Sequence, residues 1–226
     1  MSQIIKAENI SKHFTIGSQR IQILKNISLT IGKGEFVVVA GSSGSGKSTL
    51  LSVLSGLDKP DGGRVELCLR DITPMSEDQL APVRNTLIGF VFQSFHLIPS
   101  LTALENIQFP AELKKDPDAT NKAQALLEKV GLSQRANNYP SQMSGGEQQR
   151  VAICRALINA PQIVFADEPT GNLDSGNSTA IIELLAKLHE ELGMTLVIVT
   201  HSRSLAARAD RVIVLRDGVI EAGSQL

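Results

Sequence analysis

The stretch FVVVAGSSGSGKST, residues 36–49, decides the fold that this sequence predicts. It joins an apolar run to a glycine-rich loop, and leucines at helical spacing follow at Leu50, Leu51, Leu54 and Leu57. An apolar strand, a loop of the pattern G-x-x-x-x-G-K-[ST] and a helix are together typical of a phosphate-binding loop. A flexible glycine-serine turn would require neither the strand nor the helix. We therefore predict that the chain binds a nucleotide.

The chemistry expected of this loop follows from its residue types. Glycines let consecutive backbone N–H groups converge on one anion, and the following helix adds the positive end of its dipole. Lys47 is expected to reach the β- and γ-phosphates, and the Ser48 hydroxyl to bind Mg²⁺. The residues expected to hold the nucleotide here are Gly41, Ser42, Ser43, Gly44, Ser45, Gly46, Lys47, Ser48 and Thr49. A dinucleotide fold is excluded, because Thr49 stands where that pattern needs its third glycine.

The composition bounds the class of protein. The chain has 226 residues, of which 42% are apolar and 20% charged, and this suits a soluble globular protein with a large core. A net charge of −1 gives no broad attraction for nucleic acid, so no such partner is expected. Cys68 and Cys154 lie in apolar patterns and are expected to be reduced core residues in a cytosolic protein.

Membrane-spanning and targeting segments are not expected. No apolar run approaches the roughly 18 residues that a spanning helix needs, and the residues after Met1 do not begin a signal peptide. We therefore expect a protein that is soluble by itself and reaches a membrane only through a separate partner chain.

Hydrophobic patterns predict an α/β fold. Residues 27–31 alternate as a half-exposed strand does, and residues 4–10, 21–24 and 65–69 are further strand candidates. Four continuous apolar runs predict strands covered on both faces, as in a parallel sheet: 87–92, 163–166, 196–199 and 212–215.

The arrangement of these patterns predicts how the chain is divided. Helical spacing dominates from about residue 94 to 157, and a further helix with apolar positions from Ala180 to Leu188 should end at Gly193. We expect a single domain, in which residues 1–93 and 160–226 form an α/β core with a β subdomain and residues 94–159 form a helical subdomain.

An acidic pair ends one of the predicted strands. Asp167 and Glu168 directly follow the apolar run 163–166, and parallel sheets place ligands at the carboxyl ends of their strands. Asp167 is therefore the expected partner of the Mg²⁺ beside Ser48. Glu168 is expected to polarise the attacking water as a general base. An acidic pair after a strand usually starts a solvated loop, but next to a phosphate-binding loop it predicts phosphoryl chemistry.

The stretch MSGGEQQR, residues 143–150, is the second informative motif. A serine and two glycines at the start of a helix form an anion site, although alone they would suggest a simple helix cap. The stretch resembles the LSGGQ signature of ATP-binding cassette (ABC) ATPases, with Met143 for leucine and Glu147 for glutamine. The resemblance implies a P-loop NTPase fold with a RecA-like core, an antiparallel β subdomain and a helical subdomain.

The same resemblance implies roles for residues elsewhere in the chain. Phe14 lies where an aromatic ring stacks on adenine, and Gln93 begins the Q-loop and is expected to bind Mg²⁺. His201 lies where the family has its switch histidine, and residues 172–174 match the D-loop. The expected catalytic residues are therefore Lys47, Glu168, Gln93 and His201. Three positions depart from the family pattern: Phe14 stands in place of the commoner tyrosine, Ser202 in place of aspartate and Leu69 in place of a hairpin glycine.

In this family two cassettes meet head to tail, so Ser144, Gly145 and Gly146 would bind the ATP held by a second copy of the chain. Two sequence stretches are similar to the lipoprotein-release and macrolide-export (LolD/MacB-like) branch, and most similar to its YbbA-type ATPases. They are FVFQSFHLIP, residues 90–99, and ADEPTGNLD, residues 166–174. The resemblance implies Mg²⁺-dependent ATP hydrolysis that powers a separate membrane permease, with the chain peripheral on the cytoplasmic face of the inner membrane.

Two alternatives to a transport ATPase remain open. A cassette can drive a periplasmic enzyme or division machinery through its membrane partner without transporting anything, and the sequence does not separate this from transport. Soluble cassettes of translation or DNA repair usually carry two cassettes, a coiled coil or zinc cysteines, which are not found in this sequence.

Apolar residues near Gln93 suggest where a membrane subunit docks, and Phe95, Leu97 and Leu101 are the expected contacts.

Overall fold

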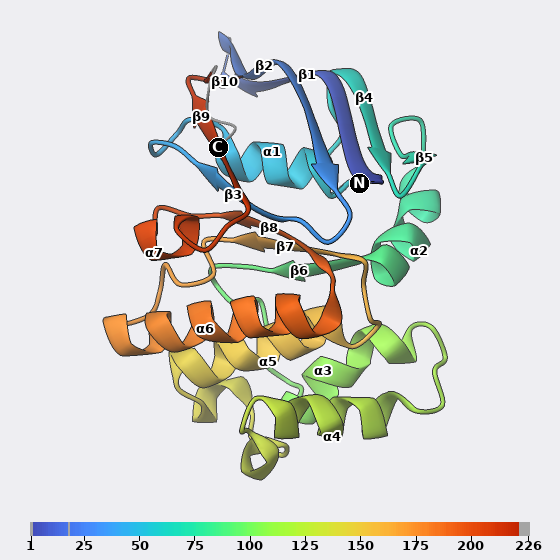
Figure 1. Ribbon diagram of the computed structural model, residues 1–226. Helices are drawn as coiled ribbons and strands as arrows, with labels where there is room; N and C mark the ends of the chain where they lie inside the picture. The colour runs from blue at the N-terminus through green and yellow to red at the C-terminus, as the bar shows by residue number, and fades with distance from the viewer. Residues whose placement is uncertain (1, 18, 222–226) are drawn as a thin grey trace. The chain divides into compact units, whose positions relative to one another are not determined.

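The computed structural model describes residues 2–17 and 19–221, which divide into two compact units (Figure 1). The first unit contains the residues up to Arg84 and those from Met194 onward, and the second contains Asn85–Gly193. The expected helical subdomain at residues 94–159 lies inside the second unit, and its boundaries as a subdomain stay a prediction.

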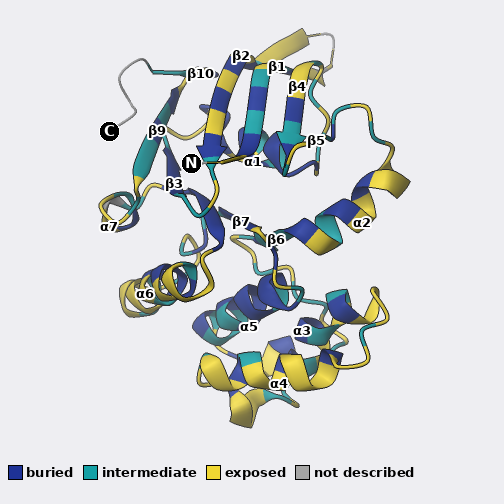
Figure 2. Cartoon of the chain, turned by 45° about the vertical axis from the view of Figure 1, so that its right-hand side comes forward, coloured by how far each residue is buried: buried dark blue, intermediate teal, exposed yellow. Residues whose placement is uncertain are grey.

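The first unit contains an antiparallel sheet with the strand order β2-β1-β4-β5. Its strands are β1 (Gln3–Ile16), β2 (Gln19–Gly32), β4 (Gly62–Leu67) and β5 (Arg70–Asp71). In β2 the side chains of Ile27, Leu29 and Ile31 are buried and the residues between them are exposed, as the alternation predicted. This buried face is turned toward helix α1 (Lys47–Leu54) of the same unit (Figures 1 and 2).

Parallel strands form the other layer of the first unit. β3 (Phe36–Ala40) lies between β8 (Thr195–Val199) and β9 (Arg211–Arg216), and pairs in parallel with both. β10 (Val219–Ile220) adds an antiparallel edge to β9, and the short helix α7 (Arg203–Ala206) follows β8. All five residues of β8 are buried, as is typical of a strand that is covered on both faces. The predicted strands at 196–199 and 212–215 are thereby confirmed.

The second unit combines two parallel strands with helices. β6 (Ile88–Val91) pairs with β7 (Ile163–Asp167), and α3 (Ala103–Glu112), α4 (Ala119–Lys129) and α5 (Gly145–Leu157) pack together (Figure 1). Two short 3₁₀ turns, Ser133–Arg135 and Pro140–Gln142, precede α5, and α6 (Ser175–Leu192) ends at Gly193 in a left-handed conformation. The helices enclose one apolar cluster, which includes Ile107, Ala123, Leu127, Val151, Cys154 and Ile158.

Helix α5 lies unusually close to strand β6. A Cβ atom built on Gly89 would overlap the backbone oxygen of Ala156, so a side chain at this position would push the helix away from the strand. The absence of a side chain at Gly89 therefore sets the separation between β6 and the C-terminal half of α5.

Two local expectations were wrong. Cys68 is half-buried and lies in the turn between β4 and β5, because the strand ends at Leu67 rather than at Leu69. Residue 87 ends a helix instead of starting a strand: α2 (Glu77–Leu87) has polar residues and Pro82 in its interior, which hid its periodicity.

Within the described part of the chain, no helix combines the length and apolar character needed to cross a membrane.

Candidate functional site

The phosphate-binding loop leaves the carboxyl end of β3 in the first unit. Lys47 is buried at the start of α1, and its Nζ donates to the backbone oxygens of Gly41, at 3.0 Å, and Ser42, at 2.8 Å. These bonds curl the loop around the ammonium group and fix the position of its charge. A Cβ atom on Gly41 would overlap the backbone oxygen of Leu215 and approach the Ser45 hydroxyl, so this position requires glycine.

The loop fits a bound phosphate. Ser42, Ser43 and Gly44 are exposed, while Ser45 is 3% exposed and its Oγ has no hydrogen-bond partner among the described residues. Across residues 2–17 and 19–221 no side chain caps α1, whose N-cap residue is Gly46. A buried hydroxyl and uncapped helical N–H groups are donors that a phosphate would satisfy.

Two further predicted residues belong to the first unit. His201 follows β8, which pairs with β3 through Val39 and Val199, so the histidine and the phosphate-binding loop leave the same edge of these strands. Phe14 lies on β1 with 43% of its surface exposed, and the Lys12 ammonium lies 5.6 Å from its ring centroid. The ring thus has an accessible aromatic surface, of the kind on which a nucleotide base stacks.

The acidic pair and Gln93 lie together in the second unit. β7 ends at Asp167, and its partner β6 ends two residues before Gln93, with Val91 opposite Ala166. The loops that follow these strands are joined directly: Gln93 Nε2 donates to Asn172 Oδ1, and Asn172 Nδ2 donates to the Gln93 backbone oxygen, both at 3.2 Å. The expected Q-loop and D-loop are therefore one hydrogen-bonded pair.

Glu168 has an unusual backbone conformation. Its φ of 44° lies in the left-handed region, which non-glycine residues rarely adopt. A turn closed by a 2.9 Å hydrogen bond from Gly171 N to Glu168 O contains this conformation. Strain of this kind is frequent at catalytic residues, where the surrounding structure holds it in place.

The signature motif forms a capping box at the start of α5. Ser144 is the N-cap: its Oγ accepts from Glu147 N at 3.3 Å, and its N–H donates to Glu147 Oε2 at 2.7 Å. Glu147 Oε1 also accepts from Arg135 Nε at 2.8 Å. The N–H of Ser144 is the largest cause that lowers the pKa of Glu147, and Arg135 lowers it further. The Glu147 carboxylate thus holds the exposed Ser144 in a fixed position.

The residues present fit a Mg²⁺ ion that shares its ligands with a nucleotide. No group of three or more His, Cys, Asp or Glu side chains that could hold a metal occurs in the described ranges. Mg²⁺ commonly takes one or two protein ligands and completes its shell with phosphate oxygens and water. Each unit contains a residue of this kind: Asp167 ends β7, and the exposed Ser48 lies at the start of α1.

Two polar residues of α5 were missed by the sequence analysis. Gln149 is fully buried and contacts the loop after Glu168, and Arg155 donates to two backbone oxygens in the turn after Gln93. The available signal was weak: both are polar residues on a helix whose neighbouring positions, such as Val151 and Ile153, are apolar.

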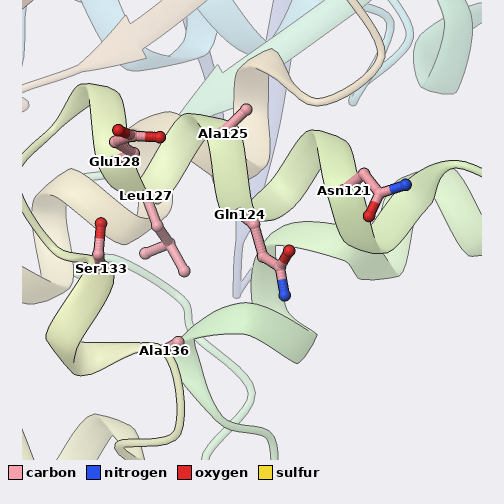
Figure 3. Close-up of a pocket in the computed structure, with 7 residues that line it drawn as sticks. All are labelled: Asn121, Gln124, Ala125, Leu127, Glu128, Ser133 and Ala136. Carbon is pink, nitrogen blue, oxygen red and sulfur yellow. The ribbon is translucent and has the colours of Figure 1, made fainter.

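The helices of the second unit also form a surface pocket of about 450 Å³ (Figure 3). It is lined by Asn121, Gln124, Ala125, Leu127, Glu128, Ser133 and Ala136. The charged group on its wall is the Glu128 carboxylate, which would repel phosphate. We therefore do not assign the nucleotide to this pocket.

Comparisons with known proteins agree on one family. The sequence model described as ABC transporter matches residues 24–171. The lipoprotein-releasing system ATP-binding protein LolD of Idiomarina loihiensis is 44% identical over 96% of this chain and 96% of its own. The macrolide export ATP-binding/permease protein MacB of Chlorobaculum tepidum is 48% identical over 96% of this chain, which spans 33% of that relative.

A solved structure extends the similarity to three dimensions. It is the dimeric post-hydrolysis state of the ATP-binding cassette MJ0796 bound to ADP and Pi. It matches with a TM-score of 0.90 and 44% identity, over 96% of this chain and 97% of that one.

A phosphate-binding loop in a parallel α/β unit defines the class of the protein as a P-loop NTPase. The chain belongs to the ABC transporter family. It is an ABC ATPase, whose nucleotide is ATP and whose metal ion is Mg²⁺. The resemblance to the LolD/MacB-like branch and the expected cassette fold are thereby confirmed.

Proposed function

We propose that this chain powers a separate integral membrane permease of the bacterial envelope, in export, extraction or mechanotransmission. The share of each relative that the chain matches supports the proposal. The chain matches 96% of the length of the LolD ATP-binding protein but 33% of the length of MacB, whose name includes a permease. The chain thus corresponds to the ATP-binding part of such machines. It would act on the cytoplasmic face of the inner membrane, bound to the permease.

The proposed roles of the site residues follow from their chemistry. Lys47 neutralises the β- and γ-phosphates, Ser48, Asp167 and Gln93 hold Mg²⁺, and Glu168 accepts the proton of the attacking water. His201 contacts the γ-phosphate and Phe14 stacks on adenine.

The test of this assignment is Glu168→Gln. An amide cannot accept the proton, so the variant should bind ATP with wild-type affinity and lose most of its turnover, by about 10²-fold or more. Turnover at the wild-type rate would remove Glu168 from the role of base.

We further propose that two copies enclose ATP, with Ser144, Gly145 and Gly146 of one copy against the phosphates held by the other. The exposed position of Ser144 at the start of α5 supports this role. In light scattering, Glu168→Gln with ATP should give a dimer. Adding Ser144→Arg should return the monomer, because it places bulk and charge at the contact. An unchanged dimer would argue against this arrangement.

The proposed contact with the permease lies just after Gln93. Phe95, Leu97 and Leu101 are all half-buried, and Leu97 packs against the apolar cluster of the second unit. Phe95→Asp with Leu101→Asp should therefore spare ATP binding yet abolish co-purification with the cognate permease. Leu97→Asp should instead lower the stability of the fold. Retained co-purification of the double variant would move the contact elsewhere.

A further inference from the structure

Helix α5 contains a buried side chain that contacts the catalytic loop. Gln149 is 0% exposed, and its Nε2 donates a 2.7 Å hydrogen bond to the backbone oxygen of Pro169. The other end of the amide, Oε1, is buried and has no hydrogen-bond partner in the described part of the chain. The direction of the amide is set by its acceptor, since a carbonyl oxygen can be contacted favourably only by the NH₂ group.

The bonded oxygen lies one residue after Glu168. Glu168 is in the left-handed conformation, and a non-glycine residue remains there only where its neighbours hold the backbone. Two hydrogen bonds do so at adjacent peptides: Gly171 N to Glu168 O, and Gln149 Nε2 to Pro169 O. The first is local to the turn, whereas the second fixes the turn to α5, the helix whose N-cap residue is Ser144.

We propose that Gln149 is a positioning residue, which fixes the direction of the Glu168 carboxylate from the signature helix by holding the Pro169 carbonyl. This inference rests on the proposed role of Glu168 as the base. A shift of the turn by a fraction of an ångström would move the carboxylate away from the water that it must polarise. Gln149 itself need not contact the reacting atoms.

The hydrogen-bond pattern argues against a packing role for the glutamine. An apolar side chain of similar length would fill the same volume without burying an unpartnered oxygen. The cost of that oxygen offsets the gain from the bond to Pro169, so the pair adds little to stability. What the bond does supply is a fixed distance between α5 and the catalytic turn.

The first experiment compares turnover with stability in the full chain. Gln149→Met keeps the volume and removes the donor, so kcat should fall by about 10- to 100-fold, while KM for ATP and the urea midpoint stay near wild type. Gln124→Met is the control: Gln124 lies exposed on α4, outside the signature stretch, and should leave kcat unchanged. A fall in the urea midpoint with unchanged kcat would overturn the proposal.

A second variant restores the donor without restoring the glutamine. In Gln149→Glu the buried carboxyl is neutral at low pH and can donate its O–H to Pro169 O. Turnover of this variant relative to wild type should therefore fall as pH rises and the carboxylate forms. For Gln149→Met the same ratio should be independent of pH. A ratio that is flat with pH for both variants would contradict a role of the donor.

A double-mutant cycle separates this inference from the assignment of the base. If Gln149 acts through Glu168, adding Gln149→Met to Glu168→Gln should not lower the residual turnover further. An additional 10-fold loss would mean that Gln149 acts elsewhere. If Glu168→Gln alone retained full turnover, the base assignment would fail. If Glu168→Gln were inactive and Gln149→Met fully active, only the positioning role would fail.

Discussion

The guanidinium of Arg155 donates from Nη1 to the backbone oxygen of His96 at 2.6 Å, and from Nη2 to that of Phe95 at 2.9 Å. Phe95 and His96 both have left-handed backbones, with φ of 59° and 49°. They form the turn that directly follows the Q-loop. A planar fork can hold two adjacent carbonyls at once, which one ammonium group cannot do with the same geometry.

Arg155→Met should therefore release this turn. We expect a loss of about 1 kcal/mol of stability, because the variant leaves the partly buried contact at the Phe95 carbonyl and the exposed one at the His96 carbonyl without their charged partner. Amide hydrogen exchange of residues 95–97 should accelerate, and Arg155→Lys should give an intermediate rate. Arg135→Met, which breaks the contact with Glu147, serves as the control. Unchanged exchange in Arg155→Met would show that the turn holds its shape without the arginine.

Removal of the loop's cation should weaken nucleotide binding. Lys47→Ala deletes the charge that the oxygens of Gly41 and Ser42 hold in place, so the Kd for Mg-ATP should rise by about 10-fold or more. Equilibrium titration with a fluorescent ATP analogue measures this change. Lys187→Ala, at an exposed position of α6, should bind like wild type. Equal affinities in the two variants would exclude Lys47 from the phosphate site.

The start of α5 should lose stability in acid. The Ser144 N–H, and then Arg135, lower the pKa of Glu147 below its ordinary value of 4.5. A carboxyl with a lowered folded pKa contributes stability above its unfolded pKa and loses it as pH falls through the folded value. Urea unfolding between about pH 5 and pH 3 should thus depend less on pH in Glu147→Gln than in wild type. Arg135→Met should keep most of the pH dependence, because the backbone N–H remains. Complete loss of the pH dependence in this variant would mean that Arg135, rather than the Ser144 N–H, is the larger cause of the lowered pKa of Glu147.

The hairpin between β4 and β5 contains removable strain. Its two turn residues, Cys68 and Leu69, have φ of 49° and 64°, and Leu69 is 85% exposed. Leu69→Gly should relieve its share of this strain and raise stability by about 0.5–1 kcal/mol, or the Tm by about 1–4 °C. Leu69→Ala removes the same apolar side chain but keeps the strain, so its Tm should not rise. An equal gain in both variants would attribute the effect to the side chain.

Contiguous motifs were the predictable part of the site. The phosphate-binding loop and the acidic pair each have their candidate residues at neighbouring positions, so spacing alone is enough to predict them. Gln149 and Arg155 act on backbone oxygens 20 and 59 residues away, and such contacts exist only once the chain has folded. The fold shows the same limit: buried strands such as β8 were evident, whereas α2 was hidden by Pro82 and its polar residues.

The close approach of Gly89 to Ala156 has a consequence for motion. Because no side chain separates β6 from α5, the helix cannot slide along the strand without a collision of backbones. Helix and strand should then move as one rigid body. A displacement applied to Ser144 at the start of α5 would reach the Glu168 turn through Gln149 and the Phe95 turn through Arg155 at the same time. The proposed base and the expected Q-loop would thus shift together rather than one after the other.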